Sequence, residues 1–595
     1  MTPQYFETHC AGRRIPLQWV RRPALGERGN RWHARRLGAS LRILAALTFT
    51  MGWAATAFTP ASATTTTATA PAWQTTWTSP TDLGVGVTAN STTRDIATVA
   101  VAGTSLEFTF SNLWSATPTT FSAVTVGVQR TGVVVAPGTF IPVTFNASRS
   151  VIIAPHARVT SDPIAMTVHA GESLAISIAV SGSATVSVHY CCYGRIDSYA
   201  TSNGAGDLTA SPSGAGFDPI LTTPNMRWLS AISVGGSSAQ GTVVALGDSI
   251  TDGFGYTNNG FSWVNALQRR ISQLPASQQM SVVNEGIAGN TLLAFPPGTT
   301  YEVDSGGLPG VTRLSPDALA LPGVKDVVLF LGINDIWFGA GGVTGHPIPP
   351  YGTASALIAG MRQAINESHA HGIKVFGITL LPRSTSTGVD NEKPEIWSPS
   401  EQAIWSALKA WMLSSRSGFD GVINLAAMMG DVYNGACQPT LPYPPYFNSD
   451  NLHPNVVGQT VMADAVSTTI FGMPEAPQSP LLLNPTPTPG CAAAKLAEKT
   501  LALGSQSSPP TTSMTSVTRP VVSTIRPTPA PRGWTSHPTT YFAIALLASV
   551  VAALWSVRQR VHRRRALRRR MARPADVPRT SPPRLPRSGS STPRR

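Results

Sequence analysis

The chain has 595 residues, too many for one compact domain, and 42% of them are hydrophobic, which is enough for sizeable cores. The formal net charge is +14, but nine Arg lie within residues 1–45 and fourteen more follow Val557. The residues between these two ends are mildly acidic, which argues against a nucleic-acid-binding surface on the folded part, and we expect no nucleic-acid partner. We interpret each basic run as a solvated tail; recruitment of a polyanion is the alternative.

The N-terminal 63 residues have the pattern of a basic leader followed by a signal peptide. An apolar stretch at residues 43–58 has about the length of a signal-peptide core, and Ala61-Ser62-Ala63 then offers small residues at the spacing that a signal peptidase accepts. Because the basic leader is long, an uncleaved anchor is the alternative. Residues 64–76 are rich in Thr and Ala and are predicted to form a spacer.

Residues 77–235 are predicted to form an all-β, sandwich-like domain. Short alternating or β-branched runs are separated by Gly, Asn, Pro and Ser, and no helical period of useful length is present. These runs cover residues 96–101, 105–110, 123–128, 151–153, 165–168, 174–180 and 184–189.

The pattern changes at Gly241, and residues 241–472 are predicted to form an α/β domain. Short apolar runs alternate with amphipathic stretches, which indicates a parallel sheet covered by helices on both faces. One helix is expected over residues 353–371, with Gly372 as its C-terminal cap. Another begins at a capping box formed by Ser398 and Glu401. Ligands of such sheets bind beyond the carboxyl ends of the strands.

The C-terminal part is predicted to attach the protein to a membrane. Residues 474–538 are rich in Pro, Thr and Ser and indicate an extended stalk. Residues 541–557 carry no charge and rise about 25 Å as a helix, at the short end for a transmembrane segment; a buried core helix is the alternative. The Arg-rich residues 558–595 are expected in the cytoplasm, which places residues 64–540 outside the cell.

Four cysteines fall in the exported region: Cys191, Cys192, Cys437 and Cys491. An even set in an exported chain is typical of disulfides. We consider a bridge from one of the adjacent pair to Cys437 plausible, although the sequence does not assign the connectivity. There is no C-x-x-C pair and no His cluster, so we expect no metal site.

Two sequence blocks could supply the nucleophile and the base of an acyl-transfer reaction. A buried strand, residues 243–246, runs directly into Gly247-Asp248-Ser249, which puts the Ser249 hydroxyl at the carboxyl end of the first parallel strand. Far downstream, Asp450 and His453 are three residues apart in a loop, and such a pair provides a general base and the acid that orients it. Taken singly, the serine block also fits a plain helix cap.

Two further strand ends could supply an oxyanion hole, the hydrogen-bond donors that stabilise a tetrahedral intermediate. Gly289 follows the second strand and allows close approach of its backbone N–H. Asn334 follows the third strand and could donate from its side-chain amide. Each signal is weak alone, because Gly and Asn are common where strands end.

Taken together and in this order, the blocks resemble the SGNH hydrolase superfamily, the GDSL-like esterases and lipases. The resemblance covers about residues 241–472 and implies a three-layer, flavodoxin-like α/β fold. Ile250 stands where many members carry Leu. The blocks are Gly247-Asp248-Ser249, Gly289, Gly332-Ile333-Asn334-Asp335 and Asp450-Asn451-Leu452-His453.

By this resemblance, Ser249 is the nucleophile, His453 the base and Asp450 its orienting acid. The oxyanion donors map to the Ser249 amide, Gly289 and Asn334, and the family implies no metal or cofactor. The preceding β-rich region looks like the domain before the catalytic unit in a subgroup of carbohydrate esterases and arylesterases.

We therefore expect an extracytoplasmic, membrane-attached esterase whose best substrate guess is acetylated polysaccharide, with lipid or aryl esters next. The alternative from another class is a surface glycan-binding protein whose hydrolase domain is secondary. A structural envelope protein that uses mainly its stalk is a weaker interpretation. The sequence leaves the oligomeric state open.

Overall fold

The computed structural model describes residues 72–190, 198–217, 225–253, 262–296, 306–342, 347–386, 395–433 and 435–473, together with Thr488 and Cys491. The predicted signal peptide, transmembrane segment and basic tail lie outside these residues, as do Cys191 and Cys192. No helix in the described part of the chain is long and apolar enough to cross a membrane.

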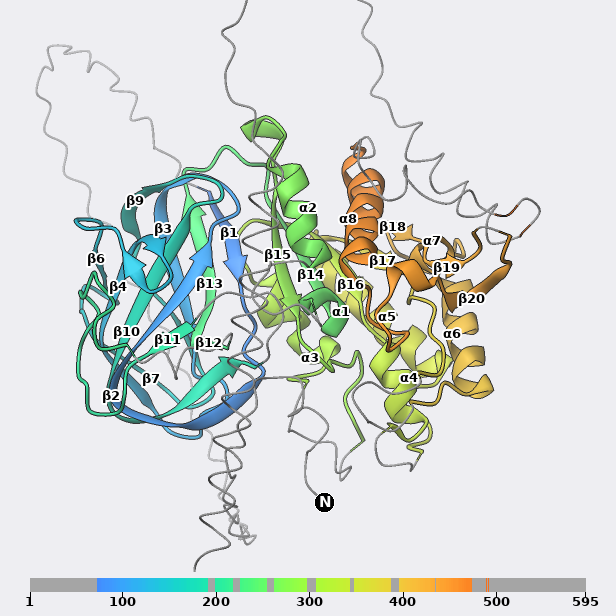
Figure 1. The fold of residues 1–595 in the computed structure, drawn as a ribbon, viewed down its shortest axis with the longest axis horizontal. Helices are drawn as coiled ribbons and strands as arrows, with labels where there is room; N and C mark the ends of the chain where they lie inside the picture. Colours follow the sequence, from blue (N-terminus) through green and yellow to red (C-terminus); the bar gives the residue numbers. More distant parts are fainter. Residues whose placement is uncertain are drawn as a thin grey trace, which may run out of the picture. The chain divides into compact units, whose positions relative to one another are not determined.

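The first domain consists of two antiparallel sheets that share one apolar core (Figure 1). In one sheet the strand order is β1-β13-β3-β8, with β9 also paired to β3; in the other it is β11-β2-β10-β4-β5, with β6, β7 and β12 paired to its strands. The strands are β1 (Trp73–Thr78), β2 (Leu83–Thr98), β3 (Gly103–Ser111), β4 (Thr119–Thr131), β5 (Val134–Val135), β6 (Ile141–Val143), β7 (Val151–Ile153), β8 (Arg158–Thr160), β9 (Ile164–Val168), β10 (Ser173–His189), β11 (Ser198–Ala200), β12 (Met226–Arg227) and β13 (Leu229–Gly235).

Alternating side chains explain why this region forms two facing sheets. In β3, Leu106, Phe108 and Phe110 are fully buried, whereas the residues between them are partly exposed. Because neighbouring side chains of a strand point to opposite faces, such a strand presents one apolar face to the core. The prediction of an all-β region before the α/β domain is confirmed.

The first strand begins earlier than the sequence suggested. Trp73 pairs with Gly235, and Gln74 pairs with Val234, so β1 starts inside residues 64–76, the range predicted as a spacer. The correction has a physical reason: the Thr-rich segment supplies an edge strand whose partner, β13, lies more than 150 residues away along the chain. Local composition carries no information on such a partner.

The second domain contains a five-stranded parallel sheet in the order β15-β14-β16-β17-β18, the 2-1-3-4-5 order of flavodoxin-like folds. Its strands are β14 (Thr242–Gly247), β15 (Ser281–Gly286), β16 (Val324–Phe330), β17 (Lys374–Ile378) and β18 (Gly421–Ile423). The central strand β14 is buried along its whole length, as expected for a strand covered on both faces. The parallel α/β prediction is confirmed.

The helices are α1 (Ser249–Asp252), α2 (Trp263–Ile271), α3 (Gly310–Leu314), α4 (Ile333–Gly339), α5 (Ala354–Ala370), α6 (Pro399–Met412), α7 (Leu425–Met428) and α8 (Val456–Phe471), and a small hairpin is formed by β19 (Gly430–Asp431) and β20 (Gln438–Pro442). Helices α2 and α8 pack side by side (Figure 1), and α5 packs against α3 and against α6. The predicted capping box of Ser398 and Glu401 is present in α6, and Gly372 follows α5 in a left-handed conformation.

Cys437 forms a disulfide with Cys491, 54 residues further along the chain. The bridge considered from the adjacent cysteines to Cys437 is therefore wrong. Cys491 is only 3% exposed, and the amide of Thr488 donates a hydrogen bond to the Val432 carbonyl at 2.8 Å. Thr488 and Cys491, which lie within residues 474–538 predicted as a stalk, thus both contact the α/β domain.

Polar contacts join the two domains along β1. The Thr75 amide donates to the Pro322 carbonyl at 2.8 Å, and the Thr242 hydroxyl donates to the Thr75 carbonyl at 2.9 Å. A second contact lies at the end of β10, where His189 Nε2 is 3.1 Å from a carboxylate oxygen of Asp252 in α1. Both side chains are fully buried, so the β-rich domain touches the short helix that begins at Ser249.

Candidate active site

The Ser249 side chain lies at the carboxyl end of β14, as predicted. The strand ends at Gly247, and Asp248 caps α1 by accepting a hydrogen bond from the Ile250 amide at 3.0 Å. The turn is tight: a Cβ added at Gly247 would lie 2.1 Å from the Thr251 hydroxyl oxygen. This turn from strand to helix therefore requires glycine before the Asp-Ser pair. Ser249 is 7% exposed at the end of the strand.

The structure brings Ser249, His453 and Asp450 into one continuous hydrogen-bonded line. Ser249 Oγ lies 2.8 Å from His453 Nε2, across 204 residues of sequence. The other ring nitrogen, His453 Nδ1, lies 2.6 Å from a carboxylate oxygen of Asp450. The second carboxylate oxygen accepts the backbone amides of Leu452 at 3.0 Å and His453 at 2.9 Å. Both carboxylate oxygens of Asp450 therefore accept hydrogen bonds that hold the His453 imidazole in one orientation.

The electrostatics of this loop keep Asp450 ionised. Burial raises the pKa of Asp450. The charge of His453, the hydrogen bond from its ring and those from the two backbone amides lower the pKa by more than burial raises it, and the net result is a pKa of about 2. An ionised carboxylate accepts hydrogen bonds only, so Nδ1 of the imidazole must carry a proton. Nε2 is then the nitrogen free to take a proton from Ser249.

The predicted oxyanion residues lie at the neighbouring strand ends. The Asn334 side chain, 7% exposed at the start of α4, donates one amide hydrogen to the Asn290 carbonyl at 2.9 Å. Gly289 has φ +75°, a conformation that favours glycine. In the part of the chain that the structure describes, no acceptor takes the backbone N–H of Ser249 or of Gly289. These amides are available to a ligand.

Asp335, on α4, holds the loop that follows Gly289 by hydrogen bonds. The Gly332-Ile333-Asn334-Asp335 block did not predict this role. The Asp335 carboxylate accepts the amides of Leu292 at 2.8 Å and Leu293 at 2.9 Å. Burial raises the pKa of Asp335 to about 6, although these hydrogen bonds lower it. Burial likewise raises the pKa of Asp248 to about 7, with the Ile250 amide and the charge of His453 acting in the opposite direction.

Two residues near the site were missed by sequence reasoning. The Asn290 carbonyl accepts the amide of Asn334, and the Asn290 side chain contacts Arg313, which is 1% exposed. Asn290 adjoins the predicted glycine block, so its position was the only available signal. Nothing in the sequence around Arg313 points to the site. No group of three or more His, Cys, Asp or Glu that could hold a metal occurs among the described residues.

Comparison with known proteins identifies the domain. The sequence model of the GDSL-like Lipase/Acylhydrolase family matches residues 245–461. Similar solved structures include the M. smegmatis aryl esterase, at 17% identity over 38% of this chain and 96% of that chain with a TM-score of 0.26. An acetyl xylan esterase matches at 19% identity over 38% and 97%, TM-score 0.25. A GDSL-like lipase from Bacteroides thetaiotaomicron matches at 19% over 39% and 86%, TM-score 0.26.

A comparison with curated proteins gives no match. The family match spans the segment in which the structure joins the strand-end serine to its histidine and aspartate. Residues 245–461 are therefore a GDSL-like lipase/acylhydrolase domain of the SGNH type, and the chain is an enzyme of a carboxylic-ester hydrolase family.

Proposed function

We propose that the protein hydrolyses carboxylic esters through an acyl-enzyme formed on Ser249. The observation that carries this proposal is the line of two hydrogen bonds, 2.8 Å from Ser249 to His453 and 2.6 Å from His453 to Asp450. Such a line delivers a hydroxyl proton to a base that is already oriented. Asp450 holds the tautomer and stabilises the imidazolium that forms.

The reaction then proceeds in two halves. In the first, Ser249 Oγ forms a bond to the ester carbonyl carbon while its proton passes to His453 Nε2, and the tetrahedral intermediate collapses as the alcohol leaves with that proton. In the second, His453 takes a proton from water, the water oxygen attacks the acyl carbon, and Ser249 regains its proton as the acid departs. The cycle consumes one water and releases one alcohol and one acid.

The oxyanion of each tetrahedral intermediate is assigned to the amides of Ser249 and Gly289 and to the side chain of Asn334. The first two have no acceptor within the described residues, and the Asn334 amide has a second hydrogen besides the one bound to Asn290. Donors held by the fold before substrate arrives cost no reorganisation during the reaction, which makes them effective in lowering the barrier.

For the substrate, we propose O-acetyl esters of carbohydrates. The support is the similarity of the β-rich region to the domain that precedes the catalytic unit in a subgroup of carbohydrate esterases and arylesterases. Lipid or aryl esters are the second choice. Glycan binding with a secondary hydrolase domain is less well supported, since the serine, histidine and aspartate are all present and hydrogen-bonded.

We further propose that the catalytic domain lies outside the cell and that the protein is attached to the membrane. The support is entirely from the sequence: the apolar segments at residues 43–58 and 541–557 and the Arg-rich ends that flank them. The Cys437–Cys491 disulfide is consistent with an oxidising compartment. Protease treatment of intact cells should then remove residues 64–540; a fully protected ectodomain would contradict this topology.

The test of the activity is hydrolysis of 4-nitrophenyl acetate by the full-length protein purified in mild detergent, beside Ser249→Ala. The matched control is Ser368→Ala, which removes a buried hydroxyl on α5 that donates to the Ala364 carbonyl, a contact within one helix. We expect activity in the wild type and the control and none above background in Ser249→Ala. Equal rates in all three would refute the mechanism. Faster release of acetate from acetylated xylan than of longer acyl chains from 4-nitrophenyl esters would support the carbohydrate assignment.

A further inference from the structure

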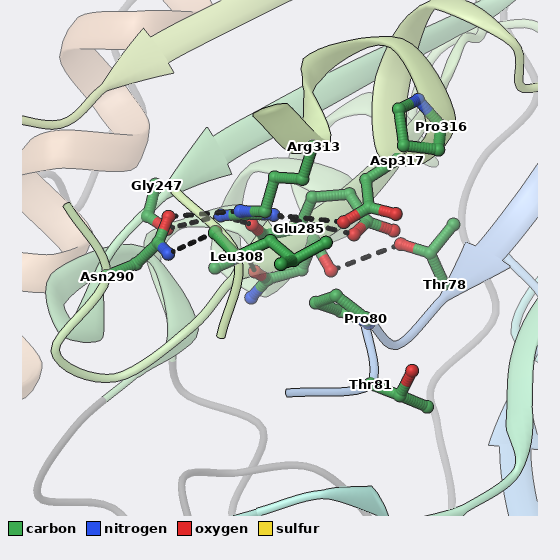
Figure 2. A network of polar contacts seen from close by, with 12 residues as sticks. Thr78, Pro80, Thr81, Gly247, Glu285, Asn290, Leu308, Arg313, Pro316 and Asp317 are labelled. Carbon is green, nitrogen blue, oxygen red and sulfur yellow. Dashed lines mark hydrogen bonds and ion pairs between the residues drawn. The ribbon is translucent and has the colours of Figure 1, made fainter. Parts of the chain in front are cut away.

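A buried arginine lies beneath the catalytic strand ends, outside every motif of the hydrolase. Arg313, on the short helix α3, is 1% exposed, and its guanidinium contacts two backbone carbonyls and one side-chain amide (Figure 2). One terminal nitrogen donates to the Gly247 carbonyl at 2.9 Å and to the Glu285 carbonyl at 2.8 Å. Gly247 ends β14 and Glu285 lies at the end of β15, so Arg313 ties together the carboxyl ends of two adjacent strands.

These contacts lead directly to the proposed nucleophile. Gly247 is two residues before Ser249, in the tight turn where added side-chain volume would collide with Thr251. A charged donor on the Gly247 carbonyl fixes the plane of the peptide that opens this turn. Charge-assisted hydrogen bonds are roughly twice as strong as neutral ones, so this contact is well suited to hold the turn.

The same guanidinium also reaches the oxyanion side of the site. Arg313 Nε donates to the side-chain oxygen of Asn290 at 3.0 Å, while the Asn290 amide donates to the Leu308 carbonyl at 2.8 Å. The backbone carbonyl of Asn290 in turn accepts the Asn334 side chain at 2.9 Å. One planar group therefore contacts both the nucleophile turn and the residue that orients Asn334.

The network continues into the β-rich domain. Arg313 lies 3.6 Å from a carboxylate oxygen of Asp317, which is 6% exposed and forms an ion pair with Arg158 at the start of β8. Arg158 also donates to the Pro316 carbonyl at 2.7 Å. Burial lowers the pKa of Arg158, but the charge of Asp317 and its hydrogen bond raise the pKa by more than burial lowers it. The net shift is therefore upward, and the Arg158 side chain stays charged.

Charges alternate along this line. Glu285, 3.9 Å from Arg313, is the second carboxylate beside it, so two arginines face two carboxylates in a largely buried strip. Removing the charge of either arginine would leave a single arginine beside the two buried carboxylates, and an uncompensated buried charge is costly in a protein interior.

We propose that Arg313 is a positioning residue of the hydrolase site, and that Arg158 makes the β-rich domain part of that site by holding Asp317 against it. The proposal rests on the esterase function proposed above. Arg313 does not touch substrate; it holds the Gly247–Ser249 turn and the Asn290–Asn334 pair at a fixed separation. The β-rich domain therefore contributes to turnover as well as to any recognition of the alcohol portion of the ester.

The experiment compares Arg313→Lys and Arg158→Met in the full-length protein, with kcat and KM measured on 4-nitrophenyl acetate. Lysine keeps the charge but lacks the planar fork that reaches two carbonyls and an amide at once. The fraction of reactive Ser249 is counted with a fluorophosphonate, so that kcat is expressed per functional site. A misfolded fraction then lowers the count and leaves kcat per site unchanged.

The matched control is Arg94→Lys. Arg94 is also fully buried and also donates to backbone carbonyls, those of Val133 and Ser211, but it lies within the β-rich domain away from α3. A small misplacement of reacting groups has large kinetic effects, so we expect kcat per site to fall about 10- to 100-fold in Arg313→Lys and about three- to tenfold in Arg158→Met. KM should stay within about twofold of the wild type, and Arg94→Lys should keep the wild-type kcat per site.

A wild-type kcat per site in folded Arg313→Lys would overturn the positioning role. If Arg313→Lys does not fold, Arg158→Met tests the proposal instead, because the Arg158 side chain is 24% exposed and easier to replace. A wild-type kcat there would overturn the contribution of the β-rich domain and the positioning network with it. Equal rates for wild type and Ser249→Ala would instead refute the esterase proposal itself.

Discussion

Replacing Asn334 by alanine should reduce turnover far more than stability. The side-chain amide donates one hydrogen to the Asn290 carbonyl at 2.9 Å, and its second hydrogen is assigned to the oxyanion. Loss of one oxyanion donor costs about 3–4 kcal/mol of transition-state stabilisation, or roughly 10²–10³ in kcat. Loss of the bond to Asn290 costs about 1 kcal/mol of folding free energy.

The assay measures kcat and KM on 4-nitrophenyl acetate together with urea unfolding of the same preparation. KM should change little, because the donor acts mainly on charge that develops after substrate binds. The control is Asn112→Ala, which removes another buried amide that donates to carbonyls, those of Thr117 and Ala154, inside the β-rich domain. This variant should lose stability and keep kcat.

A folded Asn334→Ala variant that retained kcat within about threefold of the wild type would refute the role of Asn334 as an oxyanion donor. A loss of turnover in Asn112→Ala as large as that in Asn334→Ala would also refute it, because the effect would then follow from general destabilisation.

Three further predictions concern the orienting acid, a buried carboxyl and the disulfide. Asp450→Asn should lower kcat by about 10²–10⁴, because the amide no longer fixes the His453 tautomer; steady-state kinetics with a loss under tenfold would contradict this. Burial raises the pKa of Asp248 from 3.8 to about 7, so the folded state holds a proton that the unfolded chain loses. Its contribution to stability is fully present below pH 3.8 and declines by up to about 1.4 kcal/mol per pH unit as pH rises to about 7. Urea unfolding at pH 5 and pH 8 should therefore show a smaller difference in Asp248→Asn than in the wild type, and an unchanged difference would contradict the shift. The paired variant Cys437→Ser/Cys491→Ser opens a loop of 54 residues and should lose up to about 4 kcal/mol of stability, measured by urea unfolding under non-reducing conditions; an unchanged midpoint would show that this bridge does not constrain the unfolded chain.

Much of the fold and the core of the site could be predicted because the signals are local. Parallel strands buried on both faces appear as continuous apolar runs, and Gly247-Asp248-Ser249 directly follows one of them. Since carboxyl ends of parallel strands meet at one edge, residues after different strands could be placed together without knowing the helices between them. The distance between Ser249 and His453 confirms that placement.

What the sequence could not provide depends on partners that are remote along the chain. Arg313 lies in a segment without a motif, and its carbonyl partners at Gly247 and Glu285 carry no side-chain signature. The pairing of Cys437 with Cys491 was missed because Cys491 lies in a Pro/Thr-rich segment whose composition predicts no packed structure. Trp73 was assigned to a spacer for the same reason, since its partner strand β13 is distant.

The most direct test of the account is where a serine-directed fluorophosphonate reacts. The full-length protein is treated briefly with the reagent, digested and examined by mass spectrometry, beside Ser249→Ala and His453→Ala. The account predicts one adduct, on Ser249, with loss of esterase activity in proportion to its formation. The adduct should be absent in Ser249→Ala and form far more slowly in His453→Ala, which lacks the base 2.8 Å from Ser249 Oγ. An active protein that is fully inhibited while Ser249 remains unmodified would contradict it.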